Sequence, residues 1–407
     1  MGPVVDNCVG CDEMKLERLL SMKGGRGEAS YLNNSQAQVS FFLFLFFKLF
    51  SRRPVFLGEH AKSTLHLLRE TLDGMRLSSP EFPFVVADLG CSCGSNTLNT
   101  MEVIINHVTK RYEDAHLDPP EFSAFFSDLP SNDFNTLFHL LPPYGGGGGG
   151  MGKRVGVLSD SHRSYFAAGV PGSFHRRLFP AKSVDFFYSA FSLHWLSQIP
   201  DVVLDERSTA YNKGRIFIHG ANESTVYAYR KQFQSDLGRF LSSRSKELKC
   251  GGSMFLVCLG RTSSDPTDQG GAGLLFGTHF QDAWEDLVHE GLITSEQRDN
   301  FNIPVYAPSL EEFKEVVEAD GSFIINKLQV IRGGSPLVVN HPDDAAEIGG
   351  ALANTCRSVT GVLVDAHIGN RLSDEIFSRV ASRAMSQAKD LLEQLQFFHV
   401  VAILSLA

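Results

Sequence analysis

The stretch PFVVADLGCSCGSNT (83–97) is the part of the chain that decides the fold. Its apolar residues 84–87 predict a short buried strand, and the acid Asp88 follows directly. Gly90 and Gly94 then predict a tight turn, after which a helical pattern begins. A strand, a glycine turn and a helix in this order are typical of open α/β proteins, which bind ligands at the carboxyl ends of their strands.

The glycine turn alone does not identify a ligand. Glycines let the backbone approach a bound molecule and the next helix offers N–H donors, but such a turn can also be purely structural. The spacing differs from the GxGxxG of dinucleotide-binding proteins. Walker A and GxSxG sequences are absent from the chain, which disfavours phosphoryl transfer and serine hydrolysis.

A second acid favours an adenosine site. EFSAFFSDL (121–129) predicts another strand, which ends near Asp128. A carboxylate there can accept hydrogen bonds from both hydroxyls of a ribose. It could also cap the helix that NDFNTLFHLL (132–141) predicts, although Asn132 or Asp133 is the natural N-cap. Because Asp128 lies further along than the roughly 20 residues usual in NAD-binding folds, an adenosine-containing cofactor is favoured over NAD.

Strands and helices alternate along the rest of the chain. SVDFFYSAFSLHWLS (183–197) predicts a third strand that turns into a loop or helix. Further strands are expected at 250–261, 322–331 and 396–405, and helices at 60–72, 223–249, 280–290, 309–318 and 373–394. This alternation predicts an α/β fold with a parallel or mostly parallel sheet.

Composition limits the function classes. The 407 residues, 43% hydrophobic and 20% charged, fit a globular protein with a sizeable core. A net charge of −9 without a long basic run argues against nucleic acid as a partner. Seven cysteines, an odd number, predict a reducing compartment, which we take to be the cytoplasm. No signal pattern and no stretch of about 20 apolar residues is present, so we expect no membrane partner.

Six ordered motifs give the chain a specific resemblance. They are KGGRGEASYLNNSQAQ (23–38), ADLGCSCGSNT (87–97), FFSDLPSNDFNTLF (125–138), GVPGSFHRRLFP (169–180), FYSAFSLHWLS (187–197) and RDNFNIPVYAPS (298–309). With them the sequence resembles the plant SABATH methyltransferases, which move the methyl group of S-adenosylmethionine onto small carboxylic acids or alkaloid nitrogens. GGAGLLFGTHFQDAWEDLV (270–288) and the pair His194–Trp195 are most similar to the branch that methylates indole-3-acetic acid.

The resemblance implies a Rossmann-like S-adenosylmethionine-dependent methyltransferase sheet with a mostly α-helical cap. The parts would interleave along the chain. Residues 1–38 would form an N-terminal cap and binding loop, 39–59 an atypical insert, 60–200 the first part of the core, and 201–407 the remaining core strands with cap helices. Family members are often homodimers, so a homodimer is an expectation that rests on the resemblance alone.

The resemblance also implies roles for single residues. The residues expected at the cofactor are Tyr31, Asn34, Cys91, Asn96, Asp128, Leu129, Ser173 and Phe174, with Asp88 beneath the glycine turn. Those expected to face the acid are Lys23, Gln38, Phe191, His194 and Trp195. Gln38 can donate from its side-chain amide and Trp195 from its indole N–H, so this pair is predicted to hold the carboxylate and aim one oxygen at the methyl group. His194 could instead be a packed core residue.

A loop matches positions at which family members are sometimes assigned Mg²⁺. The residues are Asn212, Asp299, Phe301 and Asn302, of which Phe301 could contribute only its backbone carbonyl. One carboxylate with amide and carbonyl oxygens suits a hard cation, and a hydrogen-bonded loop without metal is the alternative. Any ion there is expected to be structural, because the transfer needs no Lewis acid.

The segment VSFFLFLFFKLFSRRPVFLGE (39–59) departs from the family pattern. In family members the loop that here ends at Gln38 runs almost directly into the helix that here starts near residue 60. We therefore interpret 39–59 as foreign to the fold, as a retained intron or displaced exon boundary would leave it. The alternative is a genuine hydrophobic lid, or a partner or membrane contact. Since the segment follows Gln38 directly, an impaired lid is expected.

The predicted reaction is the methylation of a small plant acid, with indole-3-acetic acid as the leading substrate. Salicylate or benzoate, jasmonate and gibberellin are the alternative acids. A catalytically silent protein that binds the cofactor or a hormone is the alternative from another class.

Overall fold

The structure, a computed structural model, describes residues 16–17, 19–24, 30–34, 59–144, 162–337 and 339–407. Gln38 lies outside the described residues, and so does the predicted insert at 39–59 except for Glu59. Glu59 is the first residue of helix α3 (Glu59–Gly74), so the helix expected at 60–72 is confirmed with slightly wider bounds.

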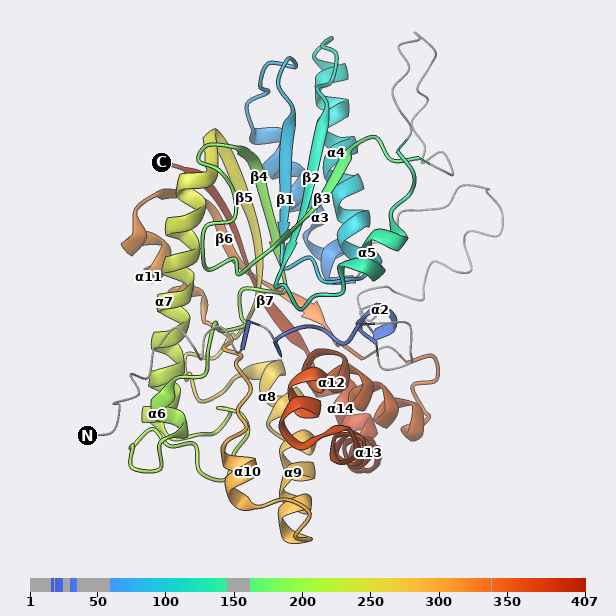
Figure 1. Ribbon diagram of the computed structural model, residues 1–407, viewed down its shortest axis with the longest axis vertical. Helices are drawn as coiled ribbons and strands as arrows, with labels where there is room; N and C mark the ends of the chain where they lie inside the picture. Colours follow the sequence, from blue (N-terminus) through green and yellow to red (C-terminus); the bar gives the residue numbers. More distant parts are fainter. Residues whose placement is uncertain (1–15, 18, 25–29, 35–58, 145–161, 338) are drawn as a thin grey trace, which may run out of the picture.

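The described strands form one seven-stranded sheet in the order β3-β2-β1-β4-β5-β7-β6 (Figure 1). The strands are β1 (Phe84–Leu89), β2 (Phe122–Asp128), β3 (Phe166–Pro171), β4 (Val184–Ala190), β5 (Leu248–Gly260), β6 (Phe323–Gly334) and β7 (Phe397–Leu406). Neighbouring strands from β3 to β5 pair in parallel, whereas β7 pairs antiparallel with both β5 and β6. The predicted mostly parallel α/β sheet is confirmed.

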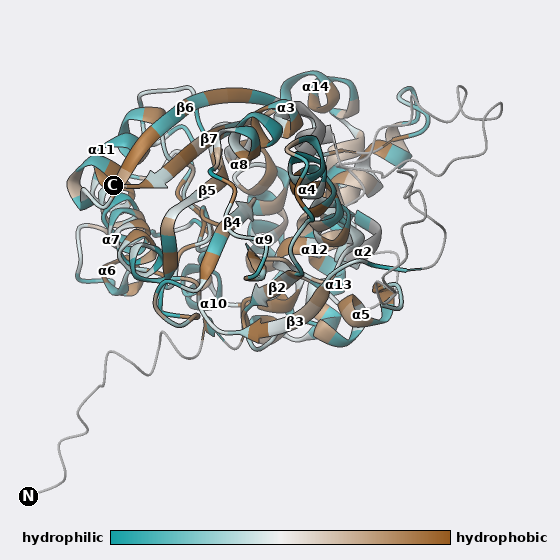
Figure 2. Cartoon of the chain, turned by 90° about the horizontal axis from the view of Figure 1, so that it is seen from above, coloured by the Kyte–Doolittle hydropathy of each residue, from teal (hydrophilic) through white to brown (hydrophobic). Residues whose placement is uncertain are grey.

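Two layers of helices cover the sheet. Helix α3 and α4 (Ser95–Asp114) pack on one face, while α7 (Glu223–Glu247) and α11 (Leu310–Asp320) lie on the other. Figure 2 shows β4, β5 and β7 between these two layers. Strand β1 contributes side chains to both faces of the sheet, because neighbouring residues in a strand point in opposite directions. Val86 packs in the core under α3 and α4, whereas Ala87 and Leu89 pack in the core under α7.

A third group of helices gathers beyond the carboxyl ends of the parallel strands and forms the cap (Figure 1). It contains α8 (Gly270–Phe276), α9 (His279–His289), α10 (Ser295–Asp299), α12 (Ala345–Ile368), α13 (Asn370–Met385) and α14 (Ala388–Gln394). The short helices α2 (Tyr31–Asn34), α5 (Phe134–Leu140) and α6 (Asp201–Leu204) complete the described set. The single helix expected at 373–394 is wrong in one respect, since α13 and α14 are separate. None of the described helices combines the length and hydrophobicity needed to cross a bilayer.

Candidate active site

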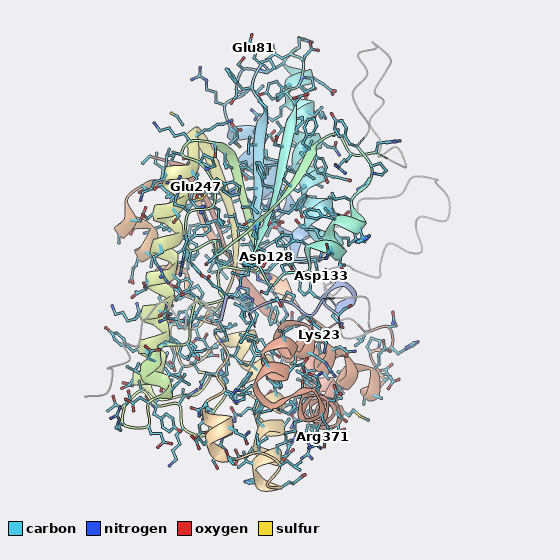
Figure 3. All side chains as sticks on the ribbon, in the orientation of Figure 1. Lys23, Glu81, Asp128, Asp133, Glu247 and Arg371 are labelled. Carbon is cyan, nitrogen blue, oxygen red and sulfur yellow. The ribbon has the colours of Figure 1, made fainter. Side chains whose placement is uncertain are left out.

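A cavity lies where the parallel strands end and the cap begins. Its walls come from the N-terminal segment, from the loops that follow β1 to β4, and from α8, α12 and β7. Nine of the residues predicted for the site line it, namely Tyr31, Asn34, Asp128, Leu129, Ser173, Phe174, Phe191, His194 and Trp195. Figure 3 shows Asp128 at this edge of the sheet, with Lys23 between it and the cap helices.

The turn after β1 requires a glycine at position 90. Gly90 has a φ of +82°, and a Cβ atom there would lie 2.1 Å from the Ser192 side-chain oxygen. The backbone N–H groups of Gly90 and Cys91 both donate to the Ser127 carbonyl, at 2.8 and 3.1 Å. The glycine therefore lets the turn pack directly against the loop that follows β4, and both segments border the cavity.

Asp128 is held in place by the turn. Its Oδ2 accepts the backbone N–H of Ser92 at 2.7 Å, and its Oδ1 accepts that of Leu129 at 2.8 Å. Burial raises the pKa of Asp128 to about 6, and these two N–H donors oppose the rise. The helix-cap alternative is wrong, because the N-cap of α5 is Asp133, which accepts the Thr136 N–H. Each oxygen of the fixed carboxylate keeps a lone pair for a ligand.

Asp88 lies beneath the turn and is not part of the cavity lining. It is buried and accepts a hydrogen bond of 2.5 Å from the Thr97 hydroxyl, at the start of α4. Burial raises the pKa of Asp88 to about 7, with the nearby charge of Asp128 adding to the rise and Thr97 opposing it. Its observed contact is thus structural support for the glycine turn.

Two further residues predicted for the cofactor are not among the lining residues. Cys91 is buried, its thiol donates to the Ser92 carbonyl at 3.4 Å, and burial raises its pKa. Asn96 lies at the start of α4, directly after the turn. Both lie close in the chain to Gly90 and Ser92, which do line the cavity.

An aromatic wall follows β3. Ser173 and Phe174 line the cavity, and the Phe174 ring lies edge-on to the rings of His175 at 4.6 Å and Phe240 at 6.0 Å. A ring fixed between two other rings is a suitable platform for a flat base. Tyr31 and Asn34, on α2, line the same cavity.

His194 follows β4 and is a neutral donor. The Leu259 backbone N–H donates to its Nδ1 at 3.3 Å, so the proton of the neutral ring is on Nε2. Burial lowers the pKa of His194 to about 3. The ring is therefore both a buried residue and a cavity residue, and it can offer an uncharged Nε2–H to a ligand.

Trp195 adds a second donor. In the described part of the chain no acceptor partners its indole N–H, although the ring lines the cavity. Its backbone forms a bridge with Val305, which also lines the cavity. Phe191, three residues before His194, has a φ of +60° and packs edge-on against His399 at 4.9 Å.

Several lining residues escaped the sequence prediction. Apolar side chains come from α8, α12 and β7, namely Leu275, Phe276, Val359 and Phe397. The helical spacing of Ile348, Leu352, Cys356 and Val359 was a signal for α12 that the prediction missed. Strand β3 was missed because its sequence, FAAGVP, has few residues that favour strands and lies at the sheet edge.

Lys23 is not among the cavity-lining residues. Its ammonium pairs with Asp365 on α12 at 3.5 Å, and its backbone N–H donates to the Ser358 carbonyl at 3.0 Å. The neighbouring Met22 does line the cavity. Lys23 thus attaches the N-terminal segment to the cap.

The four residues predicted for Mg²⁺ do come together. Asn212 donates to the Asn302 side-chain oxygen at 2.7 Å, and Asn302 donates to the Asp299 carbonyl at 3.1 Å. The Asp299 carboxylate is already paired with Arg298 at 2.9 Å. In the described part of the chain no three His, Cys, Asp or Glu residues gather around a metal-sized space. The donor set therefore fits a divalent cation poorly, because Arg298 already neutralises its one carboxylate.

The seven-stranded sheet with its reversed β7, the glycine turn after β1 and the acid at the end of β2 are typical of the Rossmann-like methyltransferase class. A family model described as SAM dependent carboxyl methyltransferase matches residues 55–407. The chain belongs to this family of S-adenosylmethionine-dependent carboxyl methyltransferases, the SABATH enzymes.

Individual relatives agree with this assignment. The chain is 62% identical over 407 residues to indole-3-acetate O-methyltransferase 1 of Arabidopsis thaliana, covering 100% of both chains. It is 56% identical to indole-3-acetate O-methyltransferase 1 of Oryza sativa subsp. japonica, covering 97% of this chain and 94% of the relative. A solved structure of loganic acid methyltransferase with SAH superposes with a TM-score of 0.78 at 30% identity, covering 95% of this chain and 98% of the other.

Proposed function

We propose that this enzyme methylates the carboxylate of indole-3-acetic acid and releases the methyl ester. The observation that carries the proposal is a pair of uncharged donors, His194 Nε2–H and Trp195 Nε1–H, in a cavity with apolar walls beside Asp128. Such a cavity suits a flat aromatic ring with one carboxylate. The 62% identity to an indole-3-acetate O-methyltransferase favours this acid over salicylate, benzoate, jasmonate and gibberellin.

The residues of the Asp128 side would hold the cofactor. The two lone pairs left on Asp128 would accept the ribose hydroxyls, Phe174 and Ser173 would border the adenine, and Tyr31 and Asn34 would close the site from the N-terminal side. Leu129 would add an apolar contact. Asp88, Cys91 and Asn96 would act through the glycine turn, which they support or border.

The methyl transfer needs no acid or base from the side chains. A carboxylic acid with a pKa of about 4 is ionised at neutral pH, so no general base is required. When bound, S-adenosylmethionine supplies a methyl group on a positively charged sulfur, and an acid oxygen displaces that sulfur in line. The protein contributes position, which can supply roughly 7–11 kcal/mol. Trp195 would donate to the carboxylate, and His194 would add a hydrogen bond. Gln38, which lies outside the described residues, remains the predicted second donor from the sequence. We assign Lys23 to anchoring the N-terminal segment.

Methyl transfer from radiolabelled S-adenosylmethionine to an acid panel tests the proposal. The acids are indole-3-acetate, salicylate, benzoate, jasmonate and gibberellin. We expect indole-3-acetate to give the highest kcat/KM. A different leading acid would change the substrate and keep the reaction. Binding of S-adenosylhomocysteine (SAH) without transfer to any acid would identify the catalytically silent alternative.

The same panel tests the insert. We propose that 39–59 is foreign to the fold, and we expect its replacement by a two-residue bridge to raise soluble yield and activity. The physical reason is that an exposed run of phenylalanines promotes aggregation. The deletion leaves α3 intact from His60 onwards. Lower activity after deletion would favour a functional lid and overturn the interpretation.

We propose that Mg²⁺, if it binds near Asn212 and Asp299, has no part in the transfer. The Arg298–Asp299 pair already supplies the local charge balance, and the reaction needs no Lewis acid. We expect dialysis against EDTA to leave kcat/KM unchanged. A loss that added Mg²⁺ restores would contradict this expectation.

We also propose a cytoplasmic homodimer. All five described cysteines are free thiols, which fits a reducing compartment. The dimer rests on family resemblance, and the mass of the purified protein in light scattering tests it directly.

A further inference from the structure

Two buried Arg–Glu clusters lie outside the cavity, and each is hydrogen-bonded to a different part of its wall. The cofactor-side cluster is Arg244 with Glu247, at the end of α7. The acid-side cluster is Arg261 with Glu312, at the end of β5 and the start of α11. We propose that these four are positioning residues that set the two halves of the active site separately. The acid-side half rests on the proposed function above.

The cofactor-side cluster is closed to solvent. The side chains of Arg244 and Glu247 are both 0% exposed, and Arg244 Nε donates to Glu247 Oε2 at 2.7 Å. The two other nitrogens of the guanidinium donate to backbone carbonyls, Nη1 to Phe174 at 2.7 Å and Nη2 to Arg176 at 2.8 Å. One side chain thus fixes both the helix end and the segment that carries Phe174.

Glu247 holds the other end of the same segment. Its Oε1 accepts the backbone N–H groups of Leu178 at 2.6 Å and Phe179 at 3.0 Å. Together the pair holds 174–179 at four backbone points. Figure 3 shows Glu247 at the end of α7, away from Asp128. Neither Arg244 nor Glu247 lines the cavity, so the hydrogen bonds to 174–179 connect the cluster to it, as expected of positioning residues.

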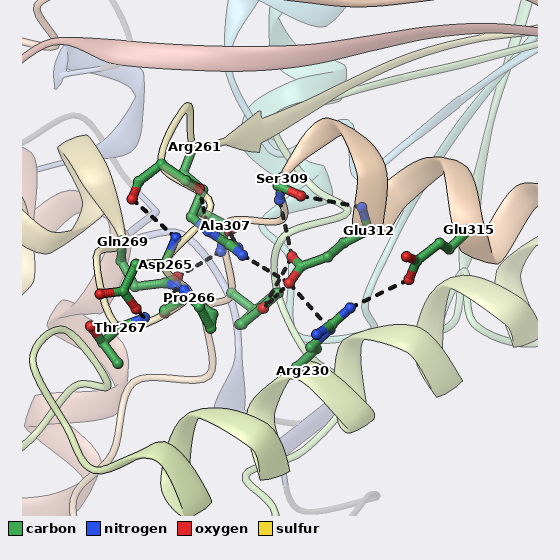
Figure 4. A network of polar contacts seen from close by, with 12 residues as sticks. Arg230, Arg261, Asp265, Pro266, Thr267, Gln269, Ala307, Ser309, Glu312 and Glu315 are labelled. Atoms are coloured by element: carbon green, nitrogen blue, oxygen red, sulfur yellow. Dashed lines mark hydrogen bonds and ion pairs between the residues drawn. The ribbon is translucent and has the colours of Figure 1, made fainter.

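The acid-side cluster has a similar design (Figure 4). Arg261 Nη2 donates to Glu312 Oε1 at 2.8 Å, and Nη1 donates to the Ala307 carbonyl at 2.5 Å. The Tyr306 hydroxyl donates to Glu312 at 3.0 Å, and Arg230 of α7 pairs with the same carboxylate at 3.2 Å. The segment held here is therefore 304–307.

This segment supports the two proposed donors. Val305 lines the cavity and forms a backbone bridge with Trp195. The Tyr306 backbone N–H donates to the His194 carbonyl at 3.0 Å. A shift of 304–307 would therefore move the backbone of His194 and Trp195, while 174–179 would stay in place.

Distance keeps the clusters separate, although α7 contacts both. Arg230 and Arg244 are 14 residues apart on this helix, which is roughly 21 Å at 1.5 Å per residue. The segments that the two clusters hold are also separate in the chain, since 174–179 follows β3 and 304–307 follows α10, and each contributes a different lining residue, Phe174 or Val305. We therefore expect a change in one cluster to affect one ligand.

Lysine substitutions test this separation. Arg244→Lys and Arg261→Lys each keep a cation beside the buried carboxylate, but an ammonium lacks the planar fork that reaches a carboxylate and a carbonyl together. We expect Arg244→Lys to raise the Kd of SAH roughly tenfold and to leave the Kd of indole-3-acetate, measured at saturating SAH, unchanged. We expect Arg261→Lys to raise the Kd of indole-3-acetate roughly tenfold and to leave the Kd of SAH unchanged. Each variant is the matched control of the other, with Tm measured for both.

Equal changes in both constants, or no change in either constant for a folded variant, would overturn the proposal. If a variant does not fold, hydrogen exchange on the wild-type full chain tests whether the two segments respond to different ligands. SAH alone should slow exchange in 174–179 and not in 304–307, and adding indole-3-acetate should slow 304–307. Protection of both segments by SAH alone would overturn it. A wild type that binds SAH but no acid would contradict the proposed function and leave the cofactor-side half to be tested alone.

Discussion

We expect the Asp128→Asn variant to bind SAH roughly 100- to 1,000-fold more weakly than the wild type. Asp128 would accept both ribose hydroxyls, and a hydrogen bond to a charged group contributes about 1.5–3 kcal/mol. A factor of ten in Kd corresponds to about 1.4 kcal/mol. Asparagine keeps the size of the side chain but turns one acceptor into an NH₂ group, which would face the N–H of Ser92 or Leu129. Isothermal titration calorimetry measures the change.

Asp185→Asn is the matched control. Asp185 is also buried and also accepts a backbone N–H, from Val85 at 2.7 Å, but it lies next to the amino end of β4, outside the cavity. It also pairs with Lys249, so the control is expected to lower Tm. Its Kd for SAH should match the wild type. A similar Kd loss in both variants would mean that general destabilisation causes the effect and would sink the ribose assignment.

The pH dependence of binding offers an independent check. Burial raises the pKa of Asp128 to about 6, so lowering the pH from 7 to 5 protonates the carboxyl. The Kd of SAH for the wild type should therefore rise over this range. The charge of Asp128 also raises the pKa of Asp88, so the asparagine variant lowers that pKa as well. The variant should consequently show a flatter profile, and a profile as steep as that of the wild type would contradict the role of Asp128.

The sequence was sufficient for the parts of the site that depend on local pattern. The strand before Asp88 and the strand that ends at Asp128 are short apolar runs, and the parallel arrangement brings their carboxyl ends to one edge. His194 shows the limit of this reasoning. The ring is buried by the protein and also borders the cavity, so burial alone does not decide between a core residue and a residue that faces the acid.

The remaining parts depend on contacts between distant segments. Lys23 pairs with Asp365, which is 342 residues away, and no local pattern indicates that partner. The reversed direction of β7 is likewise set by how it pairs with β5 and β6, since its apolar run would suit a parallel strand equally well. The apolar walls from α8 and α12 belong to helices that the prediction missed, so the shape of the acid pocket could not be predicted.

Trp195→Phe should lower kcat/KM for indole-3-acetate roughly 10- to 100-fold while the Kd of SAH stays unchanged. The change removes one N–H donor to a carboxylate, which is a loss of about 1.5–3 kcal/mol, and keeps an aromatic ring. The bridge to Val305 involves only the backbone and should persist. Initial rates at saturating S-adenosylmethionine measure the effect.

The chain has two tryptophans, so Trp284→Phe is the natural control. Trp284 is buried in the cap, stacks on Phe301 at 4.4 Å and lies outside the cavity lining, and its variant should keep wild-type kcat/KM. Calorimetry at saturating SAH gives a second comparison. The Trp284→Phe variant should keep the wild-type Kd of indole-3-acetate, whereas Trp195→Phe should raise it roughly 10- to 100-fold. A larger loss in the Trp284→Phe variant than in Trp195→Phe would contradict the placement of the acid beside Trp195.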